Sequence, residues 1–359
     1  MKQGQESFQK LWEKLEAERA GMKDYIANTQ MLSFSTDENG TSQLQMVEPD
    51  STIAQMGVTE LAHRQMAARL KIPFKYYEMM RTEQPALLDT NVNTWLHEQP
   101  ENRMVRTLHG NVRAFLSDRY QRLDNLELAH RVLKVLGENP LWAVGSCEVT
   151  ETYLYIKVVS EKLKAEVVPG DVVQAGFVVS NSEVGLGCVK IEPLVYRLVC
   201  SNGMIRNDMA HRKYHVGKRR EEFEFGAELY RDETVQADQK AYFMKVEDIL
   251  RGAVNEQLFE SAVSQMRMAK LQKIENDPIA TVKLLGESYR FTEAETMQVG
   301  ANYLKENDFT KYGLANAVTR MSQEIDDYNR ATDFERFGGQ ILDGGIDFLL
   351  KSVDARKVG

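Results

Sequence analysis

The sequence predicts an α+β protein: a curved antiparallel sheet with a crossing helix, forming a β-β-β-α-like core, followed by a helical C-terminal region. Runs rich in β-branched and aromatic residues crowd the stretch 104–200, and one segment of helical spacing interrupts them. The chain after Glu221 is periodic at helical spacing. We therefore expect an N-terminal helical arm over 1–50, an α+β core over 51–220 and a helical region over 221–359.

The N-terminal arm is expected to open with an amphipathic helix. Its apolar residues recur at helical spacing and are Phe8, Leu11, Trp12 and Leu15. The polar run 35–42 then breaks the pattern, so the arm is free to move in this interpretation.

A compact helical segment follows, with Thr59 as its expected N-cap. The apolar face of this segment consists of Leu61, Met66 and Leu70. Pro73 predicts a turn. The aromatic residues after the turn, Phe74, Tyr76 and Tyr77, are expected to pack in a core rather than to stack on bases.

The strand-rich region begins with a predicted hairpin over 104–116 that turns at His109, Gly110 and Asn111. Further strands are predicted over 152–159, 172–180, 187–192 and 194–200. Between them, residues 123–137 have helical spacing and end on Gly137, which predicts the helix that crosses the sheet. Gly185 and Gly187 lie between two strand candidates and predict a hairpin turn.

The C-terminal region begins with a periodic segment over 234–274. A helix of that length exceeds the usual range, so the pattern predicts either a kink near Gly252 or an extended arm that packs on a neighbouring subunit. Thr292 and Glu295 form a capping-box pattern at the start of a later helix. Asp326 and Asp327 are expected on the solvated face of a helix.

Composition narrows the class of protein. The chain has 359 residues and a net charge of −8. It has no run of about 18 apolar residues and no apolar leader, so we expect a cytoplasmic protein without a membrane partner. The three cysteines, Cys147, Cys188 and Cys200, are expected to be buried and reduced. Phosphate-loop, dinucleotide, nucleophile-elbow and zinc-protease motifs are all absent, which predicts a protein that is not an enzyme and has no cofactor.

Two metal-based alternatives are weaker. His211 and His215 share a helical spacing downstream of Cys200, but their neighbours are cationic and a fourth zinc ligand is missing. A magnesium nuclease would need clustered carboxylates at strand ends. The acids in the strand-rich region, Asp171, Glu183 and Glu192, lack the usual nuclease triplet.

Two basic clusters stand out in this acidic chain. From Arg197 to Arg220, seven cations face the single acid Asp208, a net charge of +6. From Arg103 to Arg122, five arginines face Asp118, a net charge of +4. Basic clusters in an otherwise acidic chain indicate a polyanionic ligand, most plausibly nucleic acid. Residues 51–220 would then be a nucleic-acid-binding core.

The second cluster has a competing interpretation. On alternating strands Arg106 and Arg113 could face away from the core, where guanidinium groups contact phosphate. Alternatively, these arginines pair with acids on the C-terminal helices, because the chain after Glu221 has an acidic excess. Charge alone leaves both interpretations open.

Six segments of the chain carry a resemblance to a known family. They are LKIPFKYY, NVNTWL, RTLHGNVRAFLSDRYQRLDN, SNSEVGLGCVKIEPLVYRLVCSNGM, HRKYHVGKR and YGLANAVTRMSQ. Over about residues 50–335 the chain resembles the phage- and plasmid-borne family catalogued as domain of unknown function nine-three-two. The resemblance implies an association with mobile elements. Its sheet with a crossing helix is similar to the core of phage single-strand annealing proteins of the Redβ, RecT and Erf type, a similarity of fold alone.

If that similarity holds, a cationic groove binds the DNA backbone and leaves the bases free to pair. The nucleic-acid-binding residues would then be Arg106, Arg113, Arg119, Arg206, Arg212, Lys213, Lys218, Arg219 and Arg220. We therefore expect an ATP-independent, homo-oligomeric protein that binds and anneals single-stranded DNA during recombination. The rival hypothesis is a protein-binding accessory or regulatory factor of a mobile element, which acts on host defence or replication machinery through its acidic helices.

Overall fold

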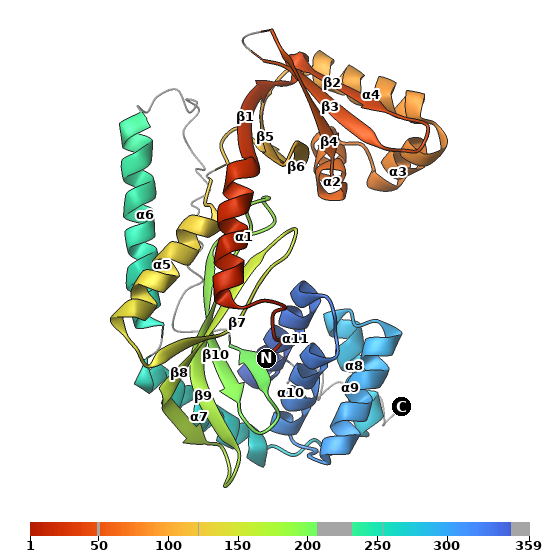
Figure 1. Cartoon of the computed structure of the whole chain (residues 1–359). Helices are drawn as coiled ribbons and strands as arrows, with labels where there is room; N and C mark the ends of the chain where they lie inside the picture. The colour runs from red at the N-terminus through yellow and green to blue at the C-terminus, as the bar shows by residue number, and fades with distance from the viewer. Residues whose placement is uncertain (49–50, 121, 207–231, 254, 346–359) are drawn as a thin grey trace.

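A computed structural model describes residues 1–48, 51–120, 122–206, 232–253 and 255–345. Figure 1 shows two lobes, one built on a six-stranded sheet (sheet A) and one on a five-stranded sheet (sheet B). The α+β class and the helical C-terminal region are confirmed. The prediction of one curved sheet is wrong, because the strands divide between two sheets.

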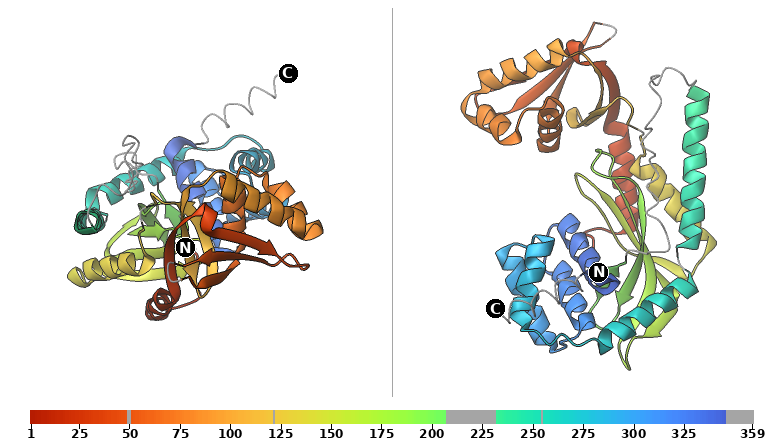
Figure 2. Two further views of the ribbon diagram at one scale, coloured as in Figure 1. Left: turned by 90° about the horizontal axis from the view of Figure 1, so that it is seen from above. Right: turned by 180° about the vertical axis from the view of Figure 1, so that it is seen from behind.

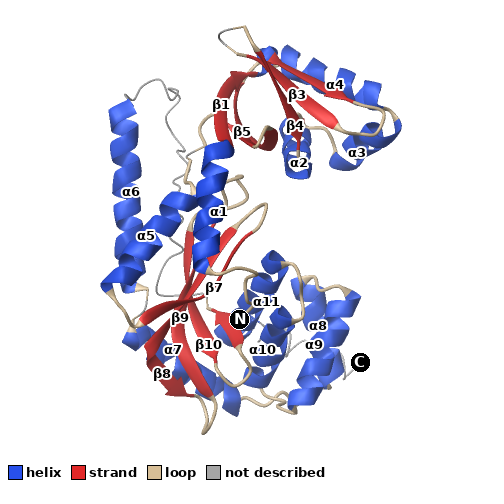
Figure 3. Ribbon diagram, viewed as in Figure 1, coloured by secondary structure: helices blue, strands red, loops and turns tan. Residues whose placement is uncertain are grey.

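Figure 3 shows how helices and strands are distributed over the two lobes. The strands are β1 Met22–Asn28, β2 Leu32–Thr36, β3 Ser42–Val47, β4 Ile53–Val58, β5 Asn102–Leu108, β6 Asn111–Ser117, β7 Trp142–Val149, β8 Leu154–Glu166, β9 Val172–Asn181, β10 Lys190–Arg197 and β11 Asn202–Ile205. The α-helices are α1 Phe8–Gly21, α2 Glu60–Arg69, α3 Phe74–Glu83, α4 Pro85–Glu98, α5 Asn125–Glu138, α6 Asp232–Gly252, α7 Glu256–Leu271, α8 Pro278–Tyr289, α9 Glu293–Glu306, α10 Lys311–Arg320 and α11 Tyr328–Gln340. Short helical turns are η1 Thr29–Met31, η3 Met321–Gln323 and η4 Ile341–Gly345.

Sheet A has the strand order β1-β5-β6-β4-β3-β2 and is antiparallel except for the short parallel pair β4–β6. The predicted β5–β6 hairpin is confirmed, and both turn residues, His109 and Gly110, have positive φ, as a two-residue primed turn requires. Helices α2, α3 and α4 supply the core on one face, around Phe34, Tyr77 and Phe115. Because β1, β2 and β3 belong to this sheet, the first 50 residues are not a helical arm, and the predicted boundary at residue 50 falls between paired strands β3 and β4.

Sheet B is an antiparallel meander with the order β11-β10-β9-β8-β7. The predicted crossing helix is confirmed as α5, which packs with α1 and α6 on a core that includes Ile156, Val158 and Phe177. Tyr155, on the opposite face of β8, packs in a separate cluster with Met1 and with Tyr328 of α11. Sheet B is therefore covered on both faces.

Helices α7 to α11 form the lower part of the sheet B lobe, on the side away from α5 and α6 (Figure 2). The long periodic segment breaks after Gly252, and α7 begins again with Asn255 as its N-cap. The kink near Gly252 is thus confirmed and the single extended helix is wrong. The capping box of Thr292 and Glu295 is confirmed, whereas Asp327 is not mid-helix but caps the N-terminus of α11.

Candidate nucleic-acid interface

The nine predicted nucleic-acid contacts fall into two groups. Arg106, Arg113, Arg119 and Arg206 lie in the described residues. The other five lie outside the described residues and are Arg212, Lys213, Lys218, Arg219 and Arg220.

Arg106 on β5 is 1% exposed, so the expectation that it faces away from the core is wrong. Its guanidinium donates to Asp24 of β1 at 2.9 and 3.1 Å and to Asp124 at 2.8 Å. It also donates to the backbone carbonyl of Glu183 at 2.9 Å. Burial lowers the pKa of Arg106, but the hydrogen bonds to the two carboxylates outweigh it and raise the pKa above its ordinary value.

Arg113 on β6 is also part of this junction between the lobes. Its Nη1 lies 2.8 Å from Oε2 of the buried Glu183. The other oxygen of Glu183 accepts the backbone N–H of Asn125, the first residue of α5. Since the side chain of Asp124 makes no capping bond to α5, Glu183 takes over the role of an N-cap from outside the helix.

We call residues 182–187 the junction loop, because this stretch between β9 and β10 contacts both lobes. Gln65 of α2 donates to the carbonyl of Val184 at 2.7 Å, and Tyr120 donates to the carbonyl of Ser182 at 2.9 Å. Gly185 has φ +78, which confirms the predicted turn there. The residues of the RAFLSDRYQRLDN and NSEVGLG segments thus meet at one structural joint.

Arg206 lies just after β11 and is buried. Its guanidinium is hydrogen-bonded to Gln265 of α7 and to Asp343 of η4. Arg119 differs from the other three, because its side chain is exposed and forms no ion pair with a described residue. Of the four described contacts, only Arg119 is placed to meet a ligand.

The pairing interpretation of the 103–122 cluster is confirmed in part. Arg106, Arg113 and Arg122 do form ion pairs. However, their partners are Asp24, Asp124 and Glu183, which all precede residue 221 rather than lying on the C-terminal helices.

The structure shows a further basic surface that the sequence analysis missed. Residues 64–75 contain four cations and no acid. These four side chains, Arg64, Arg69, Lys71 and Lys75, are all exposed, and none forms an ion pair with a described residue. The signal available in the sequence was the lack of any acid between Glu60 and Glu78.

The three acids considered for a nuclease are each bound to a different arginine. Asp171 binds Arg197 at 2.6 Å and also accepts from Tyr312 at 2.9 Å. The other two ion pairs are Glu183 with Arg113 and Glu192 with Arg336. Within the described part of the chain, no three His, Cys, Asp or Glu residues are grouped to hold a metal ion. His211 and His215 lie outside that part.

Cys147 is buried, whereas Cys188 and Cys200 are partly exposed. No disulfide joins cysteines among the described residues, and the predicted burial holds for Cys147 alone. Burial raises the pKa of the Cys147 thiol to about 11, which keeps it protonated near neutral pH.

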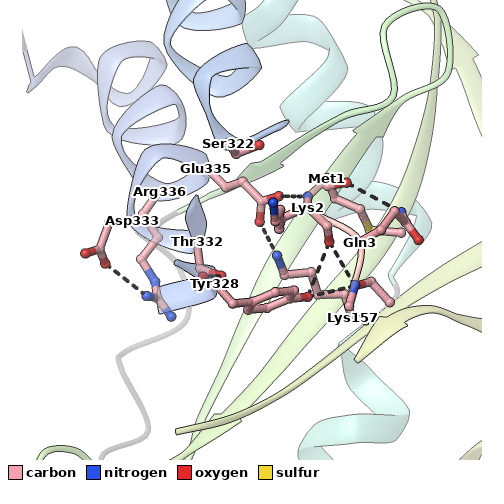
Figure 4. Close-up of polar contacts among 12 residues, drawn as sticks. Met1, Lys2, Gln3, Lys157, Ser322, Tyr328, Thr332, Asp333, Glu335 and Arg336 are labelled. Carbon is pink, nitrogen blue, oxygen red and sulfur yellow. Dashed lines mark hydrogen bonds and ion pairs between the residues drawn. The ribbon is translucent and has the colours of Figure 1, made fainter. Parts of the chain in front are cut away.

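A buried ion pair links sheet B to α11 (Figure 4). Lys157 Nζ of β8 lies 2.6 Å from Glu335 Oε2, and both side chains are 0% exposed. The other oxygen of Glu335 accepts from the backbone N–H of Lys2 at 2.6 Å, and Lys157 Nζ sits 4.5 Å from the ring centroid of Tyr328. Burial lowers the pKa of Lys157, and the Glu335 carboxylate opposes this. Both charges are enclosed, so this pair is a structural contact.

The two sheets, the crossing helix and the C-terminal helices define a two-lobed α+β protein. The chain belongs to the family described as Domain of unknown function (DUF932), because the family's model matches residues 113–336, more than half of the chain. The match begins in β6, later than the resemblance traced from about residue 50. The comparison with curated proteins finds no match, and neither does the comparison with solved structures. No described helix is both long and apolar enough to cross a membrane.

Proposed function

We propose that the chain is a phage- or plasmid-type protein that binds and anneals single-stranded DNA in the cytoplasm during recombination, without ATP, cofactor or catalysis. The observation that carries the proposal is the nine-residue segment 212–220, which holds five cations and no acid in a chain of net charge −8. Annealing needs neutralised backbones so that two like-charged strands can approach, and such a segment supplies that charge.

The structure removes three arginines from the set of proposed DNA contacts. Arg106, Arg113 and Arg206 are engaged in partly buried hydrogen bonds to acidic side chains, so we assign them to stability. The proposed DNA contacts from the original set are then Arg119, Arg212, Lys213, Lys218, Arg219 and Arg220. Arg206, which is hydrogen-bonded to α7 and η4, is the last described residue before the cationic segment.

We further propose that the protein forms a homo-oligomer, since an array of subunits repeats the cationic surface along a strand. The argument from a single long helix no longer applies, because α6 ends at Gly252. Exposed apolar side chains on α7 and α9 support self-association instead: Leu271 is 74% exposed, and Met268 and Met297 are also exposed.

The test is fluorescence anisotropy of labelled oligothymidine with the full chain, over a range of salt concentrations. The five cations of the segment 212–220 should contribute about −3.5 to the log–log salt slope, at about −0.7 per contact. The variant R212E/K213E/R219E/R220E should bind more weakly and with a flatter slope. Its matched control is K162E/K164E/K283E/K305E, which reverses four exposed lysines elsewhere. Binding should be unchanged by EDTA, and light scattering of the same samples should show an oligomer.

Two outcomes contradict the proposal at different levels. A parent chain that fails to bind oligothymidine at low salt rules out the function. A charge-reversed variant that folds and binds like the parent rules out the segment 212–220 as the contact.

The alternative function is a protein-binding accessory or regulatory factor that acts on host defence or replication machinery. The same exposed apolar residues of α7 and α9 favour it, because exposed apolar side chains also suit a protein partner. A parent chain without DNA binding would favour this alternative.

A further inference from the structure

We propose that the exposed cations Arg64, Arg69, Lys71 and Lys75, which lie on the turn between α2 and α3 and on the adjoining helix ends, form a second surface that binds the phosphate backbone of single-stranded DNA. We call residues 64–75 the basic turn. The inference rests on the proposed function and adds a contact in the sheet A lobe, outside the family match of 113–336.

Local folding places the four cations on and beside the turn that joins two helices. Helix α2 ends at Arg69 and α3 begins at Phe74, with Lys71 in the left-handed region at φ +59 and Pro73 before the new helix. Arg64 lies 4.7 Å from the ring centroid of Phe74, and Glu60 lies 2.6 Å from Arg81. The two helices therefore run in opposite directions, and the basic turn is their common end.

The charge of the basic turn is not compensated by its neighbours. The nearest acids along the chain are Glu60 and Glu78, and both bind Arg81, at 2.6 and 2.8 Å. His63 adds no charge at neutral pH, because burial lowers its pKa to about 4. Four exposed cations thus remain without an anionic partner among the described residues.

Two neighbouring features suit a nucleic-acid strand. Pro73 supplies no side-chain hydrogen bond to the start of α3, so the amides of Phe74 and Lys75 remain open toward an anion, whereas the amide of Tyr76 donates to the carbonyl of Pro73. Tyr76 is exposed beside Lys75, whereas Tyr77 is buried in the core. An exposed aromatic ring next to phosphate-binding cations is the combination that sequence-neutral single-strand binders use, since a base can stack while its phosphate is neutralised.

The experiment compares R69E/K71E/K75E with the control K162E/K283E/K305E in the anisotropy assay with oligothymidine. Each triple variant replaces three exposed cations by acids, so the change in net charge is the same. Arg64 is kept because its guanidinium packs on Phe74. Loss of three contacts should flatten the log–log salt slope by about 2, at about 0.7 per phosphate, and weaken binding at every salt concentration. The control should keep the parent slope.

The outcomes separate the two proposals. If R69E/K71E/K75E keeps the parent slope while R212E/K213E/R219E/R220E loses it, the basic turn is wrong and the function stands. If the parent does not bind oligothymidine, both are wrong. Circular dichroism checks the fold, and R69Q/K71Q/K75Q, which removes charge without adding acids, gives the same readout if the glutamate variant unfolds.

Discussion

Arginine side chains have opposite roles at different positions of this chain. Arg106 is sealed between two carboxylates, whereas Arg119, thirteen residues later on the same basic segment, is exposed. Local charge counting treats both alike, because Asp24 lies 82 residues away from Arg106 in the sequence. The sequence alone predicts whether a cation is neutralised only where the neutralising acid is its neighbour along the chain.

His63 of α2 shows how a buried residue makes stability depend on pH. Its Nδ1 lies 2.8 Å from the hydroxyl of Tyr77, and its Nε2 is buried without a partner. Burial lowers the pKa of His63 to about 4 in the folded chain, below the ordinary value of 6.5. Between these two pH values the unfolded state binds a proton that the folded state does not. The contribution of His63 to the unfolding free energy is therefore fully present above pH 6.5 and is lost as the pH falls toward 4.

We predict that acidification from pH 7 to pH 5 costs the parent chain about 2 kcal/mol more unfolding free energy than it costs His63→Gln. The reason is that glutamine has no proton to gain on unfolding. Urea unfolding of both proteins at the two pH values measures the difference. Equal losses in the two proteins would show that His63 is not kept neutral by the fold.

At the scale of elements, helices, caps and hairpins could be predicted where their signals lie close together in the sequence. The β5–β6 hairpin, the caps Thr59 and Thr292 and the crossing helix α5 are all predicted from residues within one or two turns. The pairing of β1 with β5 was not predictable in this way, because it joins segments on either side of α2, α3 and α4. Because α1 has a clear helical pattern, the first 50 residues were predicted to be a helical arm. The strands β1, β2 and β3 were therefore not predicted, and one sheet was expected instead of two.

Two glycines at helix ends should respond oppositely to alanine. At Gly339 of α11 a Cβ would lie 1.9 Å from the carbonyl oxygen of Ile205, whereas at Gly252 of α6 it meets nothing within 4 Å. We predict that Gly339→Ala lowers the unfolding free energy by roughly 1–3 kcal/mol, because α11 must move away from β11. Gly252→Ala should raise it by up to about 1 kcal/mol, because alanine is the better helix former.

Urea unfolding of the two single variants beside the parent checks this pair. A neutral Gly339→Ala would contradict the close approach of α11 to β11. A strongly destabilising Gly252→Ala would contradict the open surroundings of the end of α6.

At the scale of the whole molecule, the lobes are held by α1, which continues into β1, and by the contacts of the junction loop (Figure 2). Of the nine predicted contacts, three are structural, one is exposed and five lie outside the described residues. Two of the structural arginines, Arg106 and Arg113, lie at this joint, whereas Arg206 binds α7 and η4. The basic turn was missed because the aromatic residues after Pro73 were interpreted as core, which holds for Tyr77 but not for the exposed Tyr76.

We predict that Arg106→Met lowers the unfolding free energy by about 3–5 kcal/mol, because it leaves Asp24 and Asp124 without their buried partner. The matched variant Arg119→Met, on an exposed side chain of the same basic segment, should stay within about 0.5 kcal/mol of the parent. Urea unfolding measures both. If Arg106→Met is as stable as the parent and instead loses affinity for oligothymidine, Arg106 is a DNA contact after all.

The buried pair of Lys157 and Glu335 determines when one face of sheet B can be buried during synthesis of the chain. Glu335 follows Lys157 by 178 residues, so at a synthesis rate of about 5–20 residues per second roughly 9–36 s separate the two. An unpaired buried ammonium costs several kcal/mol, so during that interval Lys157 must stay in water. The face of β8 that carries it therefore remains open on the ribosome until α11 arrives, although every strand of sheet B has by then been translated.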